Sequence, residues 1–212
     1  MGESATCHIV AAGPCEEGLS LQPAEGDFLI AADGGLRLCR RAGLVPDLFI
    51  GDFDSLPASE LSAQPPFECI ELPCAKDDTD TLAALREGLR RGWRVFEVHA
   101  ALGGDVGHEL ANLQALLYAR QQGAQALLHG GGQTVALVCP VDGLQAFATH
   151  PGMRVSVFAF AGEARGVVER GLAWELDGAT LTPAFPLGCS NKATGAQVRI
   201  GVAAGTLAVV LG

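Results

Sequence analysis

The first two-thirds of the chain alternates short apolar segments with longer segments whose apolar residues recur at helical spacing. The predicted buried strands are residues 7–12, 28–32, 48–51 and 95–100. The predicted helices, each followed by a glycine, are residues 36–42, 79–91 and 108–122. Strands that alternate with helices are typical of a parallel sheet covered by helices on both faces. We therefore expect an N-terminal α/β domain.

The pattern changes after about residue 142, where apolar residues alternate with others at the period of a half-buried strand. Residues 154–157, 197–202 and 206–211 show this alternation, and no long helical period appears there. These features predict a smaller all-β domain, antiparallel and sandwich-like. Residues 140–143, Pro-Val-Asp-Gly, have turn chemistry, so we expect a first domain of residues 1–140 and a second of residues 141–212.

Six aspartates lie in three short segments where a predicted strand meets a loop or a helix: Asp33, Asp52, Asp54, Asp77, Asp78 and Asp80. An extended backbone directs Asp52 and Asp54 to the same side, because side chains alternate along a strand. Their mutual repulsion favours a cation between them, and Mg2+ binds one or two carboxylates together with substrate phosphates. Ligands of such sheets bind outside the carboxyl ends of the strands. For any single aspartate, the alternative is a capping or turn role.

Composition limits the classes of partner. The chain has 212 residues, 49% of them hydrophobic, which is enough for a buried core. A net charge of -10 and a pI near 4.8 argue against nucleic-acid binding, which depends on lysine and arginine. No apolar stretch is long enough to span a membrane. Seven cysteines without a Cys-x-x-Cys pair favour reduced thiols, so we expect a soluble, cytoplasmic protein.

Five motifs, in order along the chain, resemble those of the thiamine pyrophosphokinases. They are residues 31–35, Ala-Ala-Asp-Gly-Gly; residues 46–55; residues 76–80, Lys-Asp-Asp-Thr-Asp; Gly103-Gly104 with His108 and the Leu-Ala-Asn of residues 110–112; and a tail with Trp174 and Ser190-Asn191. The match extends over nearly the whole chain. The resemblance implies transfer of a pyrophosphoryl group from ATP to the hydroxyl of thiamine, which gives thiamine diphosphate and AMP.

The resemblance also implies roles for individual residues. The carboxylates that would hold Mg2+ on the phosphates and carry catalysis are Asp52, Asp54 and Asp80. Residues implied to contact the nucleotide are Asp33, Gly34, Gly35, Thr79, Gly104 and His108. Thr79 and Asp80 open a predicted helix whose N-terminal amides suit a phosphate. Structural alternatives stay open, namely a cap for Thr79, a tight turn for the glycines and packing for His108.

The family builds its thiamine site from the first domain of one subunit and the β domain of the other, which implies a homodimer with a composite active site. Trp174 offers a stacking face, and Ser190 and Asn191 offer hydrogen bonds. Lys76 is a candidate contact to phosphate or substrate, with an exposed ion pair as the alternative. The alternative for Trp174 is a place in the core, where tryptophan is more often found.

One motif departs from the family pattern. The family usually has Gly-Gly-Arg-x-Asp-His, whereas residues 103–108 read Gly-Gly-Asp-Val-Gly-His, without the arginine or the aspartate. Loss of the arginine removes a planar, bidentate donor near a polyphosphate. Asp105 lies two residues before the missing aspartate, so an extended backbone could direct it to the same side as a substitute ligand.

Three functions remain open. The first is an active thiamine pyrophosphokinase, and the second is the same transfer to another acceptor, such as a hydroxymethylpterin. The third is a catalytically weak relative that binds thiamine or its phosphates. The three metal-ready aspartates favour catalysis, Trp174 and Ser190-Asn191 favour thiamine, and the altered 103–108 segment favours the weak relative.

Overall fold

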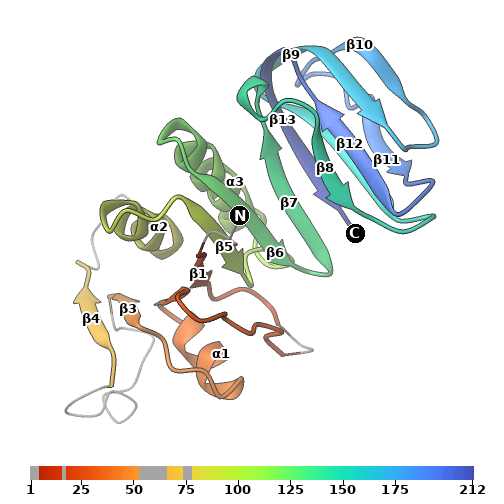
Figure 1. The fold of residues 1–212 in the computed structure, drawn as a ribbon. Coiled ribbons are helices and arrows are strands. Elements are labelled where there is room, and N and C mark those ends of the chain that lie inside the picture. Colours follow the sequence, from red (N-terminus) through yellow and green to blue (C-terminus); the bar gives the residue numbers. More distant parts are fainter. Residues whose placement is uncertain (1–4, 16–17, 53–65, 74–77) are drawn as a thin grey trace. The chain divides into compact units, whose positions relative to one another are not determined.

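The computed structural model describes residues 5–15, 18–52, 66–73 and 78–212. The chain divides into two compact units, Met1–Gly132 and Gln133–Gly212, which are drawn in Figure 1. This division falls before residues 140–143, where the turn chemistry placed it. The reason is strand β7 (Gln133–Val138), which pairs with β13 (Ala204–Leu211) and therefore belongs to the second unit. The expected turn is a short 3-10 helix, η1 (Pro140–Asp142), inside that unit.

The first unit contains a parallel sheet with the strand order β4-β3-β2-β1-β5-β6. The strands are β1 (Cys7–Val10), β2 (Phe28–Ala32), β3 (Leu48–Gly51), β4 (Glu68–Glu71), β5 (Val95–His99) and β6 (Gln125–Gly130). The apolar runs predicted four of these strands. They did not predict β4, whose residues are mostly exposed, or β6, which directly follows a helix.

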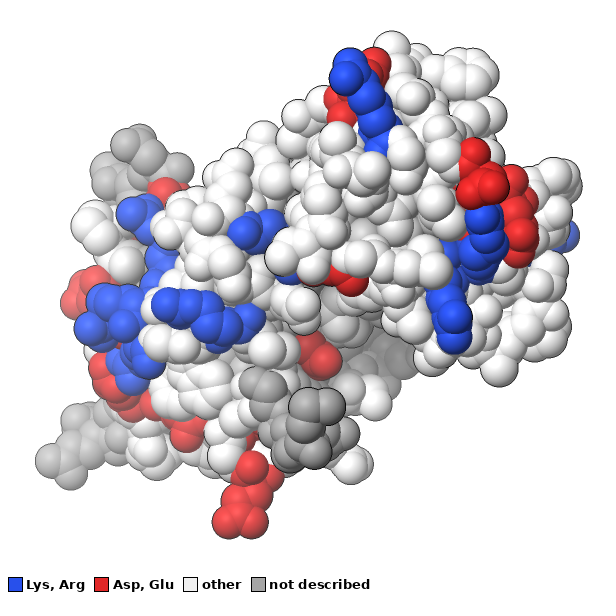
Figure 2. All heavy atoms as spheres, turned by 45° about the horizontal axis from the view of Figure 1, so that its top comes forward, with Lys and Arg blue, Asp and Glu red and all other residues white. Residues whose placement is uncertain are grey.

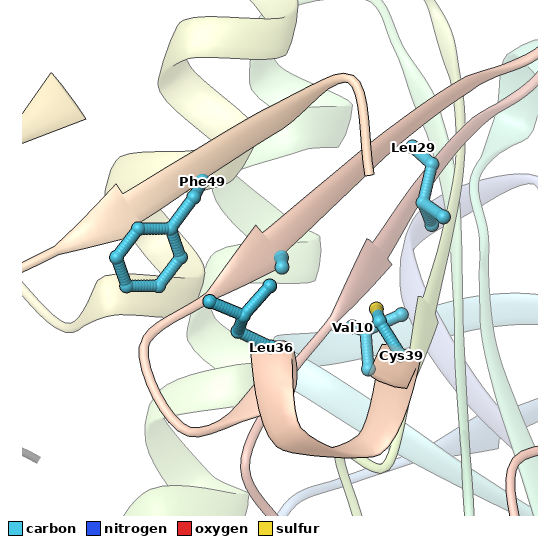
Figure 3. Packing of buried hydrophobic residues seen from close by; sticks show 6 residues of the cluster. Val10, Leu29, Leu36, Cys39 and Phe49 are labelled. Atoms are coloured by element: carbon cyan, nitrogen blue, oxygen red, sulfur yellow. The ribbon is translucent and has the colours of Figure 1, made fainter. Parts of the chain in front are cut away.

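Helices cover the two faces of this parallel sheet. They are α1 (Gly35–Arg41), α2 (Asp80–Arg90) and α3 (Val106–Gln121). Figure 3 shows the α1 face, where Leu36 and Cys39 pack with the buried side chains of Val10, Leu29 and Phe49. On the opposite face, α2 packs so closely that a side chain at Gly88 would lie 2.5 Å from the Phe96 ring.

Side-chain caps determine where α2 and α3 begin. The hydroxyl of Thr79 accepts a hydrogen bond from the Leu82 amide at 3.2 Å, so Thr79, rather than Asp78, caps α2. Helix α3 begins two residues earlier than predicted, because the carboxylate of Asp105 accepts a hydrogen bond from the His108 amide at 3.1 Å. Valine and glycine are weak helix formers, and the cap stabilises them in the first turn.

The second unit consists of antiparallel strand pairs. Its strands are β7, β8 (Gln145–Ala148), β9 (Arg154–Arg170), β10 (Leu176–Leu181), β11 (Gly188–Lys192), β12 (Gln197–Gly201) and β13. The long strand β9 pairs with β10, β11, β12 and β13. Val155, Val157, Val198, Ile200 and Val209 are fully buried. The period-two alternation thus corresponds to strands with one face in a core.

Charged side chains of the two signs lie beside each other on the face shown in Figure 2. Directly after α2, Arg91 contacts Glu68 at 2.6 Å and Glu87 at 2.7 Å. A more exposed pair, such as Arg170 with Asp177, contributes little to stability, about 0 to 1 kcal/mol. Within the described ranges, no helix has the length and apolar character needed to cross a bilayer. The described cysteines are free thiols.

One carboxyl group is buried in the second unit. Glu169 lies on β9 with 1% of its surface exposed, and its Oε1 has no hydrogen-bond partner among the described residues. Burial raises the pKa of Glu169 from 4.5 to about 7, and a hydrogen bond with the Asn191 side chain opposes this rise. A raised pKa means that the folded protein holds the proton more tightly than the unfolded chain, so stability falls as pH rises through this range.

We therefore expect the Glu169→Gln variant to match the wild type in thermal stability near pH 5 and to exceed it near pH 8. The amide keeps the shape of the protonated acid and cannot ionise, and the gain is at most about 3 kcal/mol. Thermal unfolding recorded from pH 5 to pH 8 measures it. The matched control is Glu163→Gln, because Glu163 is an exposed glutamate that pairs with Arg165. A pH-independent difference between wild type and Glu169→Gln would contradict the expectation.

Candidate functional site

A pocket of about 380 Å³ lies at the carboxyl ends of β1, β2 and β5, entirely within the first unit. Residues directly after these strands form part of its wall, including Gly13, Asp33 and Ala101. The first turns of α2 and α3 form the rest, with Thr79, Asp80, Asp105, His108 and Glu109. This is the edge of a parallel sheet at which ligands of α/β proteins bind. The pocket brings together five of the residues predicted from the sequence: Asp33, Thr79, Asp80, Gly104 and His108.

Asp33 occupies the turn between β2 and α1. Its φ of 44° is in the left-handed region, and its amide donates to the carbonyl of Ile50 at 2.8 Å. The turn therefore joins the ends of β2 and β3 and places Asp33 in the pocket wall. Gly34 and Gly35 do not line the pocket. A side chain at Gly35 would lie 1.9 Å from the carbonyl oxygen of Val10, so this glycine is needed for α1 to pack against β1.

The start of α2 presents backbone amides and a carboxylate to the pocket. Thr79 and Asp80 both line it, and the Thr79 hydroxyl is the helix cap described above. The positive end of a helix dipole favours an anion such as a phosphate at this place. The capping role of Thr79 is compatible with a ligand at this place, because its side chain uses only one of the first amides of α2.

Glu109 lines the pocket and was not among the residues predicted from the sequence. Its Oε1 accepts hydrogen bonds from the amides of Gly103 at 2.7 Å and Gly104 at 2.9 Å. The amide of Gly104, which was expected near a phosphate, therefore already has a carboxylate partner. An acidic residue in the first turn of a helix after a glycine pair is the sequence signal that could have indicated this contact.

Two further side chains shape the loop between β5 and α3. The buried Asn112 donates from Nδ2 to the carbonyl of Ala101 at 2.8 Å and so ties the loop to α3. His108 lies in the first turn of α3, lines the pocket and is exposed to solvent, so it does not pack in the core. Its ring is available to a ligand in the pocket.

The described part of the pocket wall contains Asp33, Asp80, Asp105 and Glu109 but no lysine or arginine. An anionic ligand would be repelled by these carboxylates unless a cation accompanied it. Asp52 follows β3, next to the turn of Asp33, and is half-buried, although it is not part of the pocket wall. Asp54 and Lys76 lie outside the described residues, so their predicted roles are untested.

The predicted thiamine-binding residues lie in the second unit. Trp174 is 66% exposed, which excludes the alternative that it belongs to the core. The side chain of the buried Asn191 forms two hydrogen bonds with the backbone of Trp174. Its Oδ1 accepts from the Trp174 amide at 3.2 Å, and its Nδ2 donates to the Trp174 carbonyl at 2.7 Å. The side chain of Asn191 therefore positions Trp174.

Ser190 lies beside this arrangement in a constrained backbone. Its φ is 59°, and its amide donates to the hydroxyl of Ser156 at 2.9 Å. The Ser190 side chain is exposed and lies 3.5 Å from the sulfur of Cys189. A non-glycine residue in the left-handed region is uncommon and often occurs at a functional site.

Comparison with known proteins gives a consistent family assignment. The model of the thiamin pyrophosphokinase catalytic domain matches residues 23–128, half of the chain. A thiamin pyrophosphokinase family protein from Enterococcus faecalis is 26% identical, with 98% of each chain covered and a TM-score of 0.84. The thiamine pyrophosphokinase of Bacillus subtilis is 23% identical, with 97% of this chain and 98% of that chain covered and a TM-score of 0.84.

The fold likeness extends to a more distant structure. Yeast thiamin pyrophosphokinase is 12% identical, with 100% of this chain and 87% of that chain covered and a TM-score of 0.74. No curated protein matches the chain.

The cap of α3 gives a prediction for Asp105. Replacement by alanine removes the acceptor of the His108 amide and should destabilise the protein by about 1 kcal/mol. Asp105→Ser keeps a capping oxygen and should remain close to the wild type. Denaturant unfolding of the three proteins measures the difference, and equal stability of the alanine and serine variants would show that the cap is not formed.

Proposed function

The chain belongs to the thiamin pyrophosphokinase family, and we propose that it transfers a pyrophosphoryl group from ATP to the hydroxyl of thiamine. The products are thiamine diphosphate and AMP. The observation that carries this proposal is the pocket at the ends of β1, β2 and β5, where carboxylates and the N-termini of α2 and α3 share one wall. Such a wall suits a polyphosphate that arrives with a divalent cation.

The donor set of this edge fits Mg2+. Carboxylate oxygens are the hard ligands that Mg2+ prefers, and the described pocket wall has no cationic side chain of its own to neutralise a triphosphate. We assign the metal to Asp80 and Asp52, together with Asp54 from the undescribed segment. When bound, Mg2+ neutralises the charge that develops on the transferred group. The amides at the start of α2 orient the phosphates, and Asp33 lies on the nucleotide side.

The acceptor is assigned from the second unit. The exposed ring of Trp174 is a stacking surface for the cationic thiazolium or the pyrimidine of thiamine, and Asn191 fixes the backbone from which that ring extends. Ser190 offers its exposed hydroxyl. We propose a cytoplasmic homodimer in which the first unit of one subunit and the second unit of the other form each active site.

One observation favours the weaker relative as a second candidate. The carboxylate of Glu109 holds the amides of Gly103 and Gly104, and Asp105 stands where the family usually has an arginine. A phosphate at these amides would have to displace a carboxylate.

The Asp105→Ser variant also tests the hypothesis that Asp105 is a substitute ligand, because it keeps the cap and removes the charge. Full activity of that variant would show that Asp105 is not a ligand.

The assay that tests the proposal incubates the protein with ATP, Mg2+ and thiamine and separates the products by chromatography. We expect AMP and thiamine diphosphate in equal amounts. Thiamine binding without product would support the weak relative, and the absence of both binding and product would support another acceptor, such as a hydroxymethylpterin.

In this assay, Asp80→Asn should lower kcat at least about 100-fold, because an amide cannot supply the negative ligand that the metal requires. The asparagine has nearly the same shape, so the fold should persist, as circular dichroism would check. The control is Asp177→Asn, since Asp177 is an exposed aspartate of the second unit that pairs with Arg170. Activity near the wild-type level in Asp80→Asn would place the metal on other residues.

Trp174→Ala should raise the KM for thiamine by about 10-fold with little change in the KM for ATP, since stacking on a cationic ring contributes roughly 1 to 2 kcal/mol. Because the side chain is exposed, its removal should not unfold the second unit. Trp174→Phe keeps an aromatic face and should recover most of the loss. Equal effects on both substrates would indicate a general defect and contradict the assignment.

A further inference from the structure

A second cluster of titratable side chains lies on β1, β5 and β6, which are neighbours in the parallel sheet (Figure 1). His8 on β1 is directly opposite Glu97 on β5, and His99 lies two residues further along β5. His129, near the end of β6, stacks on His99 with a ring separation of 5.1 Å. By the strand period of two, these side chains share the face of Val10, which is the α1 face, opposite α2.

Three atoms of the cluster converge. His8 Nδ1 and His99 Nε2 lie 3.1 Å apart and share a hydrogen bond, which a metal bound to both would replace. Glu97 Oε2 lies 3.8 Å from His8 Nδ1 and 3.7 Å from His99 Nε2. These separations leave a point roughly 2.1 Å from all three atoms, which matches Zn–N and Zn–O bonds of about 2.0 to 2.2 Å. A further ring nitrogen, His129 Nε2, lies 3.7 Å from Glu97 Oε2.

The other ring nitrogen of His8 has a carboxylate partner. His8 Nε2 lies 3.1 Å from Asp27 Oδ2, and Asp27 also accepts hydrogen bonds from the amides of Thr6 and Ala24, both at 2.7 Å. With Nε2 engaged by Asp27, Nδ1 is the ring nitrogen of His8 that faces the cluster, as in metal sites whose ligating histidines are held by an outer carboxylate.

The two central histidines are largely shielded from solvent. His8 and His99 are 6% and 8% exposed. A pocket of about 580 Å³ is lined by His99, His129 and Gly130, so it reaches one of the three proposed ligands. It adjoins the candidate active site, since Pro14 and Ala100 line both pockets.

We propose that His8, Glu97 and His99 form a binding site for a divalent first-row transition metal of the zinc type. Two imidazoles and one carboxylate are a zinc ligand set that leaves a fourth position open, whereas Mg2+ prefers oxygen ligands alone. The site is separate from the carboxylate edge proposed for Mg2+, and it does not depend on the proposed function. Its metal would join β1 to β5 and so stabilise the centre of the sheet.

Titration of chelator-treated protein with Co2+ and then Zn2+, in excess Mg2+ to fill the carboxylate edge, tests this site. We expect one Co2+ per chain, with the intense visible absorption of a four- or five-coordinate ion bound by nitrogen, and displacement by Zn2+. Thermal stability should rise on Zn2+ addition. Weak absorption typical of octahedral Co2+ in an oxygen environment would overturn the proposal.

Variants locate the metal within the cluster. Glu97→Gln and His99→Asn should lose the absorption, and Asp27→Asn should weaken Zn2+ binding by about 10- to 100-fold through the orientation of His8. Glu97 is partly exposed, so its variant should fold even if His99→Asn does not. His150→Asn is the control, because His150 is exposed and lies in the second unit. Undiminished Co2+ absorption in Glu97→Gln and Asp27→Asn would show that His8, Glu97 and His99 do not bind the metal.

Discussion

The parallel pairing of β1 with β2 and β5 is the constraint on which the rest of the first unit depends. In this register Val10 lies beside both Ala31 and His99, so the three strands end at one edge of the sheet. The segments that follow them, and the helices that begin beside them, must then share one space. Asp33, Asp80 and Asp105 are far apart along the chain, and they line one pocket because the strands before them end at the same edge.

Charge at this edge is balanced in part by the backbone. Asp105 accepts from an amide of α3, and Glu109 accepts from the amides of Gly103 and Gly104. These contacts hold the loop where the family usually has an arginine. The loop therefore relies on internal carboxylate-to-amide hydrogen bonds, and the cation that a polyphosphate needs has to come from elsewhere, from Mg2+ in our proposal.

The two faces and the carboxyl ends of β1 and β5 lie in three different environments. One face packs apolar side chains such as Cys7 and Phe96 against α2, and the ends of the strands open to the pocket. On the other face, His8, Glu97 and His99 form a polar cluster next to an apolar core. Polar side chains that are buried on central strands need partners, and Asp27 supplies one from the chain before β2. His8 and His99 also hydrogen-bond to each other at 3.1 Å, and in our proposal a metal takes the place of that bond.

The sequence alone determined the α/β alternation, the later change to period-two strands and the aspartates after the strands, because these features depend on local periodicity and residue chemistry. It did not predict β4 and β6. It placed the unit boundary too late, because the pairing of β7 with β13 decides that point, and it started α3 two residues late, because the Asp105 cap decides where this helix begins. Only tertiary structure decided that Glu109 occupies the glycine amides, that Trp174 is exposed and that His8 meets His99. Those contacts join residues whose proximity depends on helix and strand packing, which a linear pattern does not encode.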